Sequence, residues 1–210
     1  MAQTPAKAAT TRLTSEQRRQ QITESARTVF MAHGLAGART RDIAAQAGIN
    51  EATLYRHFKS KEELYEAAVA GPLEEAVAAL VAASGRPPAR FDTSGTAMKE
   101  RTAAFLRDLL RVMEDFGPLL GVALFGEAQA AQTYYADRIA PTLATVRDVV
   151  AANLQSWLHR DFDLDIAVRT AFGAAWFHAT AARLEGKSLD VDSVAEQIAD
   201  MMIDGLIRQQ

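Results

Sequence analysis

The chain has 210 residues, of which 49% are hydrophobic, and this is enough apolar side chain for a packed core of one or two domains. It contains no cysteine, which excludes disulfides, thiolate metal sites and cysteine nucleophiles. The first 13 residues lack the apolar stretch of a signal peptide, and no run approaches the roughly 18 uninterrupted apolar residues of a membrane span. We therefore expect a soluble, cytoplasmic protein with no membrane partner.

The net charge of −3 conceals an uneven distribution along the chain. Residues 1–61 hold 10 Lys and Arg against 4 Asp and Glu, whereas residues 62–210 hold 13 against 22. A basic N-terminal part joined to an acidic remainder is typical of a nucleic-acid-binding domain attached to one that does not meet phosphate. A merely solvated surface is the alternative interpretation, although it does not predict this segregation.

Abundant alanine and the lack of alternating Val/Ile/Thr runs predict an all-α fold of about nine helices. Thr14 and Gln17 have capping-box spacing at the start of a helix over about 15–32. Thr40 and Asn50 are expected to cap two short helices, joined by a turn at Gly48. The later helices are expected at about 97–115, after Gly117-Pro118, at 128–159 with an interruption at Pro141, at 165–185 and at 194–208.

Ser60 and Glu63 form a further capping-box pattern, which opens a fourth helix over about 61–83. Gly71-Pro72 predicts a kink or break in this helix and is a candidate hinge. The segment from Ser84 to Gly95 is rich in Pro, Gly and Ser, so we expect a loop there.

Residues 40–59, TRDIAAQAGINEATLYRHFK, have the pattern of a DNA-reading helix-turn-helix. Ala44 is small where the two helices would cross, and Gly48 lies at the turn. A random amphipathic hairpin would match the apolar positions fairly often, but seldom these residues as well. The inward positions are Ile43, Ala47, Ile49, Leu54 and Phe58, and the outward positions are Glu51, Ala52, Thr53, Tyr55, Arg56 and His57.

The string TRDIAAQAG followed by TLYRHFKSKEEL resembles the DNA-binding domain of the TetR family of transcriptional repressors, over about residues 15–65. The remaining helices are similar to the family in number, length and order. The resemblance implies phosphate contacts by Thr40, Tyr55, His57 and Lys61, base contacts by Arg41, Glu51, Ala52 and Thr53, and a backbone or base contact by Arg56.

The chemistry of these side chains suits the same roles. Arg41 can pair with guanine, and the Thr53 methyl group can meet thymine. Glu51 either accepts from cytosine or supports the N-terminus of its helix. The Thr40 and Tyr55 hydroxyls and the Lys61 ammonium group are suitable donors to phosphate oxygens.

We predict a disordered tail over 1–13, a DNA-binding domain over 14–60, a connecting helix over 61–83, and an effector-binding and dimerisation domain over 84–210. The helices at 165–185 and 194–208 combine small and large apolar residues that can pack against a symmetry mate, and the family resemblance implies a four-helix homodimer interface there. Two recognition helices in a dimer would read successive major grooves of a palindrome.

Bulky side chains in the C-terminal part are candidates for an effector pocket, although ordinary core packing is the alternative for each of them. We predict neither a metal site nor a cofactor, because no two histidines have ligand spacing and no phosphate-binding loop is present. The candidate pocket residues are Phe105, Leu109, Met113, Phe116, Leu120, Leu124, Tyr134, Trp157, Trp176, Phe177 and His178.

The sequence thus predicts a ligand-responsive transcriptional regulator, a repressor by family resemblance, that binds a palindromic operator as a dimer and is released by a hydrophobic or aromatic small molecule. One alternative is a DNA-bound protein whose body recruits a protein partner. A helical enzyme or ligand carrier is the other alternative, but no catalytic constellation supports it, so we expect no enzyme.

Overall fold

The computed structural model describes residues 13–84, 95–126, 128–157, 159 and 161–204. The predicted tail, apart from Leu13, and most of the predicted loop over 84–95 lie outside these residues. Every regular element within them is helical, which confirms the all-α fold. In chain order they are α1 (Ser15–Gly37), α2 (Thr40–Gln46), α3 (Glu51–His57), α4 (Lys61–Tyr65), the π turn η1 (Glu66–Ala70), α5 (Gly71–Ser84), α6 (Thr96–Leu124), α7 (Ala128–Tyr134), the π turn η2 (Tyr135–Ile139), α8 (Ala140–Leu154), α9 (Leu164–Leu184) and α10 (Val191–Asp204).

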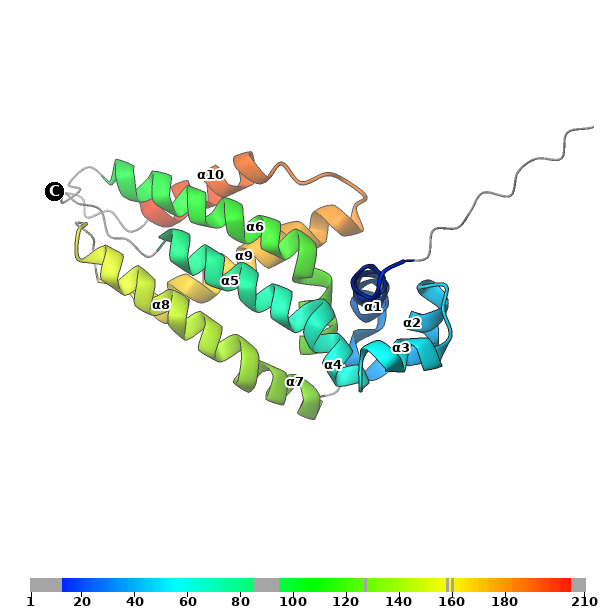
Figure 1. Cartoon of the computed structure of the whole chain (residues 1–210). Coiled ribbons are helices and arrows are strands. Elements are labelled where there is room, and N and C mark those ends of the chain that lie inside the picture. Colours follow the sequence, from blue (N-terminus) through cyan, green and yellow to red (C-terminus); the bar gives the residue numbers. More distant parts are fainter. Residues whose placement is uncertain (1–12, 85–94, 127, 158, 160, 205–210) are drawn as a thin grey trace, which may run out of the picture.

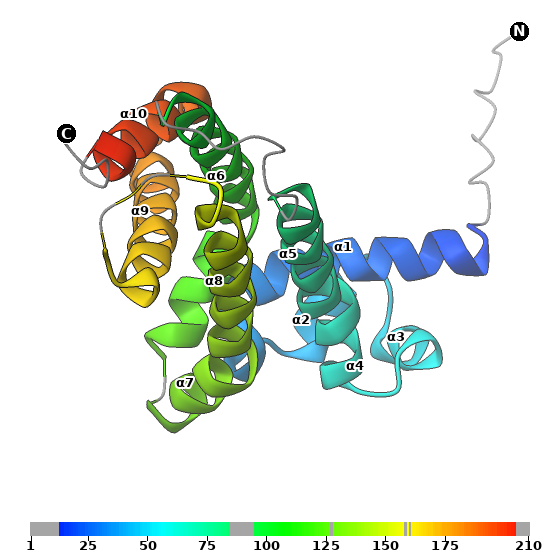
Figure 2. The same ribbon diagram turned by 90° about the vertical axis from the view of Figure 1, so that its left-hand side faces the viewer.

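The helices form a small N-terminal group and a larger elongated body (Figure 1). Helices α1 to α4 lie together at one end, and α5 to α10 make up the body, as the perpendicular view in Figure 2 also shows. Helix α6 packs against α5, α9 and α10, and it also contacts α1. It therefore connects the two parts.

Local sequence signals set the short helices near the N-terminus. Gly48 has a φ of 64°, the left-handed conformation that the turn requires, and the Asn50 side chain accepts from the Thr53 N–H at 2.8 Å. Both agree with the predictions. Thr40, however, does not cap α2, because it is the first residue of that helix and Arg39 occupies the N-cap position.

The breaks predicted at Gly71-Pro72 and Pro141 are absent, because each proline follows a π turn. Proline lacks an N–H, and its ring clashes with the carbonyl four residues earlier in an ordinary α-helix. In η1 the Gly71 N–H bonds to the Glu66 carbonyl, and in η2 the Ala140 N–H bonds to the Tyr135 carbonyl, a spacing of five residues in both cases. The wider turn lets each helix continue through its proline.

Helix α6 also continues through Gly117-Pro118, where the sequence predicted two separate helices. Pro118 removes one hydrogen bond, to the carbonyl of the exposed residue Glu114. Phe116 and Leu119, on either side of Gly117-Pro118, are both buried. Tertiary packing therefore holds this stretch helical despite the proline.

The continuous helical segment Lys61–Ser84 has the length and, with a mean hydropathy of 1.4, the apolarity of a membrane span, although only 22% of its apolar window is buried in the molecule. The sequence predicted no membrane span by the criterion of an uninterrupted apolar run. Glu74 and Glu75 interrupt the apolar run of this segment. Leu80 belongs to the body core, and Val77 and Val81 line a cavity that we describe below. Much of the apolar surface of this segment therefore packs in the core or lines the cavity.

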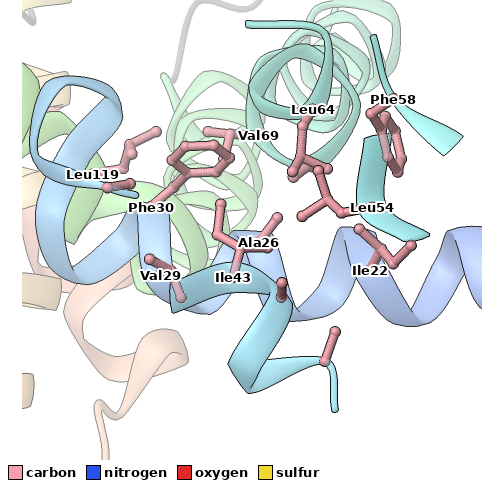
Figure 3. Close-up of a cluster of buried hydrophobic side chains, with 14 residues drawn as sticks. Ile22, Ala26, Val29, Phe30, Ile43, Leu54, Phe58, Leu64, Val69 and Leu119 are labelled. Carbon is pink, nitrogen blue, oxygen red and sulfur yellow. The ribbon is translucent and has the colours of Figure 1, made fainter. Parts of the chain in front are cut away.

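The core of the N-terminal helices includes residues from outside them. Phe30, Ile43 and Leu54 form its centre (Figure 3). Val69 of η1 and Leu119 of α6 join the same cluster and are 0% and 1% exposed. The apolar core therefore extends beyond the predicted domain boundary at residue 60.

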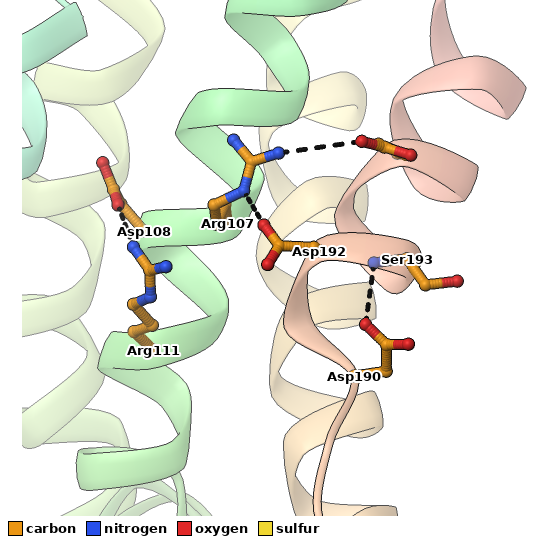
Figure 4. Close-up of polar contacts among 7 residues, drawn as sticks. Arg107, Asp108, Arg111, Asp190, Asp192 and Ser193 are labelled. Atoms are coloured by element: carbon orange, nitrogen blue, oxygen red, sulfur yellow. Dashed lines mark hydrogen bonds and ion pairs between the residues drawn. The ribbon is translucent and has the colours of Figure 1, made fainter.

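Helix α10 is fixed on α6 by ion pairs along one edge (Figure 4). Arg107 bonds to Asp192 and lies 3.9 Å from Glu196. Asp190 caps α10 by accepting from the Ser193 N–H at 3.1 Å, so this helix begins at Val191, slightly earlier than predicted.

We predict that Gly34→Ala destabilises the protein by about 1–3 kcal/mol. Gly34 has a φ of 64°, and an added Cβ would lie 2.5 Å from Val122 Cγ1, a stiff β-branched side chain on α6. Gly37→Ala is the matched control, because the nearest atom to its added Cβ is 3.4 Å away and its φ is not left-handed. Urea denaturation measures both, and equal stabilities of the two variants would contradict the prediction.

Candidate nucleic-acid interface and ligand cavity

Helix α3 presents an exposed outer face and a buried inner one. Leu54 and Phe58 are 0% and 1% exposed and pack against α1. This packing fixes the orientation of the helix without using its outer side chains. Of the predicted contact residues, Arg41, Glu51, Ala52, Tyr55 and Arg56 are exposed, and Thr40, Thr53, His57 and Lys61 are half-buried.

Three of the predicted contact residues form one hydrogen-bonded chain across the surface between α2 and α3. The Thr40 hydroxyl donates to Glu51 Oε1 at 2.6 Å, and the Tyr55 hydroxyl donates to Thr40 Oγ1 at 3.4 Å. Glu51 is therefore bound to a neighbouring side chain in the free protein. This arrangement aligns the hydroxyl groups of Thr40 and Tyr55 at the same surface.

The basic side chains of the predicted set differ in how firmly they are held. Lys61 Nζ donates to the Ala38 carbonyl at 3.3 Å, which places its charge beside the start of α2. Arg41 lies 3.6 Å from Asp42, but both side chains are more than half exposed, so this pair constrains Arg41 little. The Arg41 guanidinium can therefore reorient toward a base edge.

Arg19 of α1 is a structural contributor that sequence reasoning did not identify. Its Nη1 donates to the His57 carbonyl at 2.5 Å, and its guanidinium carbon lies 4.0 Å from the centre of the Phe58 ring. A cation at the C-terminus of α3 also complements the helix dipole. Arg19 and His57 are far apart in sequence, so no local pattern predicts the contact.

A central cavity of about 1320 Å³ lies in the body. Its wall comes from α4 and α5, from α6, from α7 to α8 and from α9, and it also includes Leu35 of α1. Apolar side chains make up most of the lining. The cavity thus reaches from the body to α1 and α4 of the N-terminal group.

Most of the predicted pocket residues line one of two cavities. A smaller one, the distal cavity, has a volume of about 210 Å³ and is lined by Phe105 and Trp157. Phe116, Phe177 and His178 line neither: Phe116 is buried beneath Arg27 of α1, and the other two are exposed on α9. The central cavity is lined by Leu109, Met113, Leu120, Leu124, Tyr134 and Trp176.

The two π turns meet at the wall of the central cavity. Arg138 of η2 bonds to Glu74 and lies 3.3 Å from Glu66 of η1. The Tyr65 and Tyr134 side chains influence each other at this wall, and partial burial is the main reason that the pKa of both tyrosines is raised. Both hydroxyls are therefore protonated at neutral pH.

One face of α9 and α10 leaves apolar side chains exposed. Phe177, Leu184 and Met201 are 65%, 81% and 70% exposed, and Ile166 continues the row along α9. Gly173 lies in the same row and also lines the central cavity, and nothing in the structure approaches the position of its missing Cβ. We call these five exposed residues the α9–α10 face.

Comparison with known proteins gives both a family and a fold. Residues 22–68 match the family model of bacterial regulatory proteins of the tetR family. The HTH-type transcriptional repressor KstR2 of Rhodococcus jostii (strain RHA1) is 28% identical over 193 residues, which cover 90% of this chain and 91% of that protein.

Solved structures show the same fold over nearly the whole chain. The ketosteroid transcriptional regulator KstR2 of Mycobacterium tuberculosis has a TM-score of 0.68 at 24% identity and covers 94% of this chain and 98% of its own. The transcriptional regulator FadR of Bacillus subtilis, in complex with stearoyl-CoA, has a TM-score of 0.65 at 17% identity, with 89% and 98% covered. Residues 22–68 of the chain thus carry a DNA-binding domain of the tetR-family type, and the whole chain has the fold of these solved regulators.

Proposed function

We propose that this protein is a ligand-responsive transcriptional repressor of the cytoplasm. It binds a palindromic double-stranded operator as a homodimer, and a hydrophobic or aromatic small molecule releases it. The central cavity carries this proposal, because Leu35 of α1 and Tyr65 of α4 belong to its wall. A molecule bound there touches the body and two helices of the N-terminal group, α1 and α4, at once.

In the DNA complex, α3 enters the major groove, and its flanking residues contact the backbone. Thr40, Tyr55, His57 and Lys61 contact phosphates, while Arg41, Ala52 and Thr53 face bases and Arg56 contacts either. For Glu51, the hydrogen bond from Thr40 supports a role in holding the Thr40 hydroxyl in position. Base reading by Glu51 requires that bond to break.

The α9–α10 face is the dimer interface of this proposal. Exposed apolar side chains in a row along one helix are costly in water, and a symmetry mate that presents the same row covers them. Phe177 stands in this row, which supports an interface role in place of the pocket role that the sequence suggested. Two chains joined there supply the two recognition helices that a palindrome requires.

The effector of this proposal has an apolar body and an anionic group. Arg169, an exposed residue, lines the central cavity and makes no hydrogen bond or ion pair within the described part of the chain. The other charged residues of the wall are Arg138, which pairs with Glu66 and Glu74, and the carboxylates Glu62 and Asp137. A carboxylate or phosphate on the effector would provide a partner for Arg169. The FadR relative was solved with stearoyl-CoA, and the KstR2 relative is titled a ketosteroid regulator, so both titles name largely apolar molecules.

The signal from the cavity travels along two contacts. One is the junction of η1 and η2, where Arg138 and Tyr134 hold the segment that follows α4. The other is α6, which lines the cavity with Leu120 and places Leu119 in the core of the N-terminal helices. A shift of either element changes the separation of the recognition helices in the dimer, which lowers operator affinity.

A DNA-bound protein that recruits a protein partner is the second candidate. It needs no large ligand site, whereas this body contains a cavity of about 1320 Å³ that is partly open to solvent. The cavity therefore favours the ligand-responsive function.

We predict that Arg41→Ala and Lys61→Ala affect DNA binding differently. Loss of the exposed Arg41 guanidinium relaxes sequence preference at one position, with a cost of about 1–3 kcal/mol on the preferred site. Loss of Lys61 weakens binding to all sequences and reduces the salt slope by about one unit. Selection from random DNA, followed by titration at several salt concentrations, measures both effects. Unchanged affinity in both variants would refute the proposed interface.

We predict that Phe177→Glu converts the dimer into monomers, because a charge would be buried against its symmetry-related copy. Leu13→Glu, at an exposed apolar residue before α1, is the control and should leave the dimer intact. Sedimentation velocity measures the mass of each variant. A dimeric Phe177→Glu protein would show that the interface lies elsewhere.

We predict that Arg138→Ala reduces the effector response but leaves operator binding of the ligand-free protein within about twofold. Arg138 contacts no predicted DNA-binding residue, and its partners Glu66 and Glu74 belong to the connecting helix. Arg147→Ala is the matched control, since Arg147 pairs with Asp148 and lines neither cavity. Operator release by ligands selected from a metabolite library gives the response, and an identical response in both variants would exclude this route.

A further inference from the structure

The central and distal cavities share part of their walls. Val81 of α5 and Phe172 of α9 line both. These two side chains therefore stand between a volume of about 1320 Å³ and one of about 210 Å³. Phe172 is half-buried, and its ring can move between staggered side-chain positions without movement of the backbone.

The polar side chains of the distal cavity are tied to its wall. Arg101 Nη2 donates to Asn153 Oδ1 at 2.8 Å and to the Ser84 carbonyl at 3.3 Å. Asn153 in turn donates to the Val149 carbonyl at 2.8 Å and to the Ser84 carbonyl at 3.1 Å, and only 7% of it is exposed. These bonds hold the polar atoms of Arg101 and Asn153 at one side of the cavity.

The remaining wall of the distal cavity is largely apolar, with Leu106, Val146, Val168 and Ala171 all buried. An apolar cavity gives water too few hydrogen-bond partners, and cavities of about 150 Å³ with such walls bind molecules as large as benzene. The distal cavity therefore suits an uncharged apolar group.

We propose that the distal cavity is the far end of the effector site and receives the apolar end of an elongated effector. This inference rests on the proposed function and extends it to the shape of the ligand. The anionic end of the effector pairs with Arg169 in the central cavity, and the chain passes between Val81 and Phe172. Molecules too short to pass these two side chains bind less tightly, by about fourfold for each methylene group left out of the distal cavity.

The two tryptophans of the sequence allow the two cavities to be observed separately. Trp157 lines the distal cavity, and Trp176 lines the central one. Bromine quenches indole fluorescence at contact, so a brominated fatty acid reports where its bromine lies. The probes are ω-bromohexadecanoate, with bromine at the apolar end, and α-bromohexadecanoate, with bromine beside the carboxylate.

The experiment uses the full-length dimer with one tryptophan replaced at a time. In Trp176→Phe, the ω-bromo probe should remove most of the Trp157 emission, whereas the α-bromo probe should not. In Trp157→Phe, the α-bromo probe should quench Trp176. If either variant fails to fold, fluorotryptophan labelling of the unsubstituted protein gives the same two reporters by fluorine NMR.

A second substitution separates the two cavities. Ala171→Leu fills the distal cavity and should abolish quenching of Trp157 by the ω-bromo probe, while Trp176 remains quenched by the α-bromo probe. Ala182→Leu is the same substitution on the same helix, at a residue that lines neither cavity, and should leave both signals unchanged.

The outcomes distinguish the two proposals. Quenching of Trp176 alone, by both probes, would overturn the distal site and leave the central effector site in place. Quenching of neither tryptophan would contradict an apolar-chain effector in the central cavity and, with it, the distal site. Quenching of Trp157 that survives Ala171→Leu would show that the bromine lies outside the distal cavity.

Discussion

The burial of Leu119 among the N-terminal helices is the contact on which the rest of the arrangement depends. Three helices that expose one face to DNA bury too little apolar surface to be stable alone. Leu64, Val69 and Leu119 supply the missing part of their core. Because Leu119 belongs to α6, the packing of the helix-turn-helix is joined to that of the body. Any ligand that displaces α6 therefore acts on the core of the DNA-binding part directly.

The prolines add a second constraint, on the helices that surround the central cavity. Pro72 and Pro141 occupy equivalent places, each at the second residue after a π turn. π turns are rare and occur often at functional sites. Here the two turns lie against each other through Arg138 and Glu66. The same local feature that keeps each helix continuous thus lies at the junction between the cavity and α4.

The sequence predicted the features of the fold that depend on residues close together in the chain. Gly48 requires a left-handed turn and Asn50 supplies a cap, so the helix-turn-helix could be located to within a residue or two. The continuity of α6 through Pro118 depends instead on packing by residues distant in sequence, such as Trp176, whose Nε1 donates to the Gly117 carbonyl. Phe177 and Trp176 are adjacent, yet one is exposed and the other lines the cavity. Composition does not predict which of these two aromatic residues lines the cavity. The direction in which each side chain points from α9 decides it.

The size of the expected response limits which contacts transmit it. A change in operator affinity of 5–150-fold requires a coupling of about 1–3 kcal/mol. The ion pairs of Arg138 with Glu66 and Glu74 join side chains that are about half exposed, and such pairs contribute about 1 kcal/mol at most. These pairs alone therefore cannot account for a strong response. The half-buried tyrosines Tyr65 and Tyr134 and the Leu119 packing have to change as well, so a strong effector must displace α6 and α4 together.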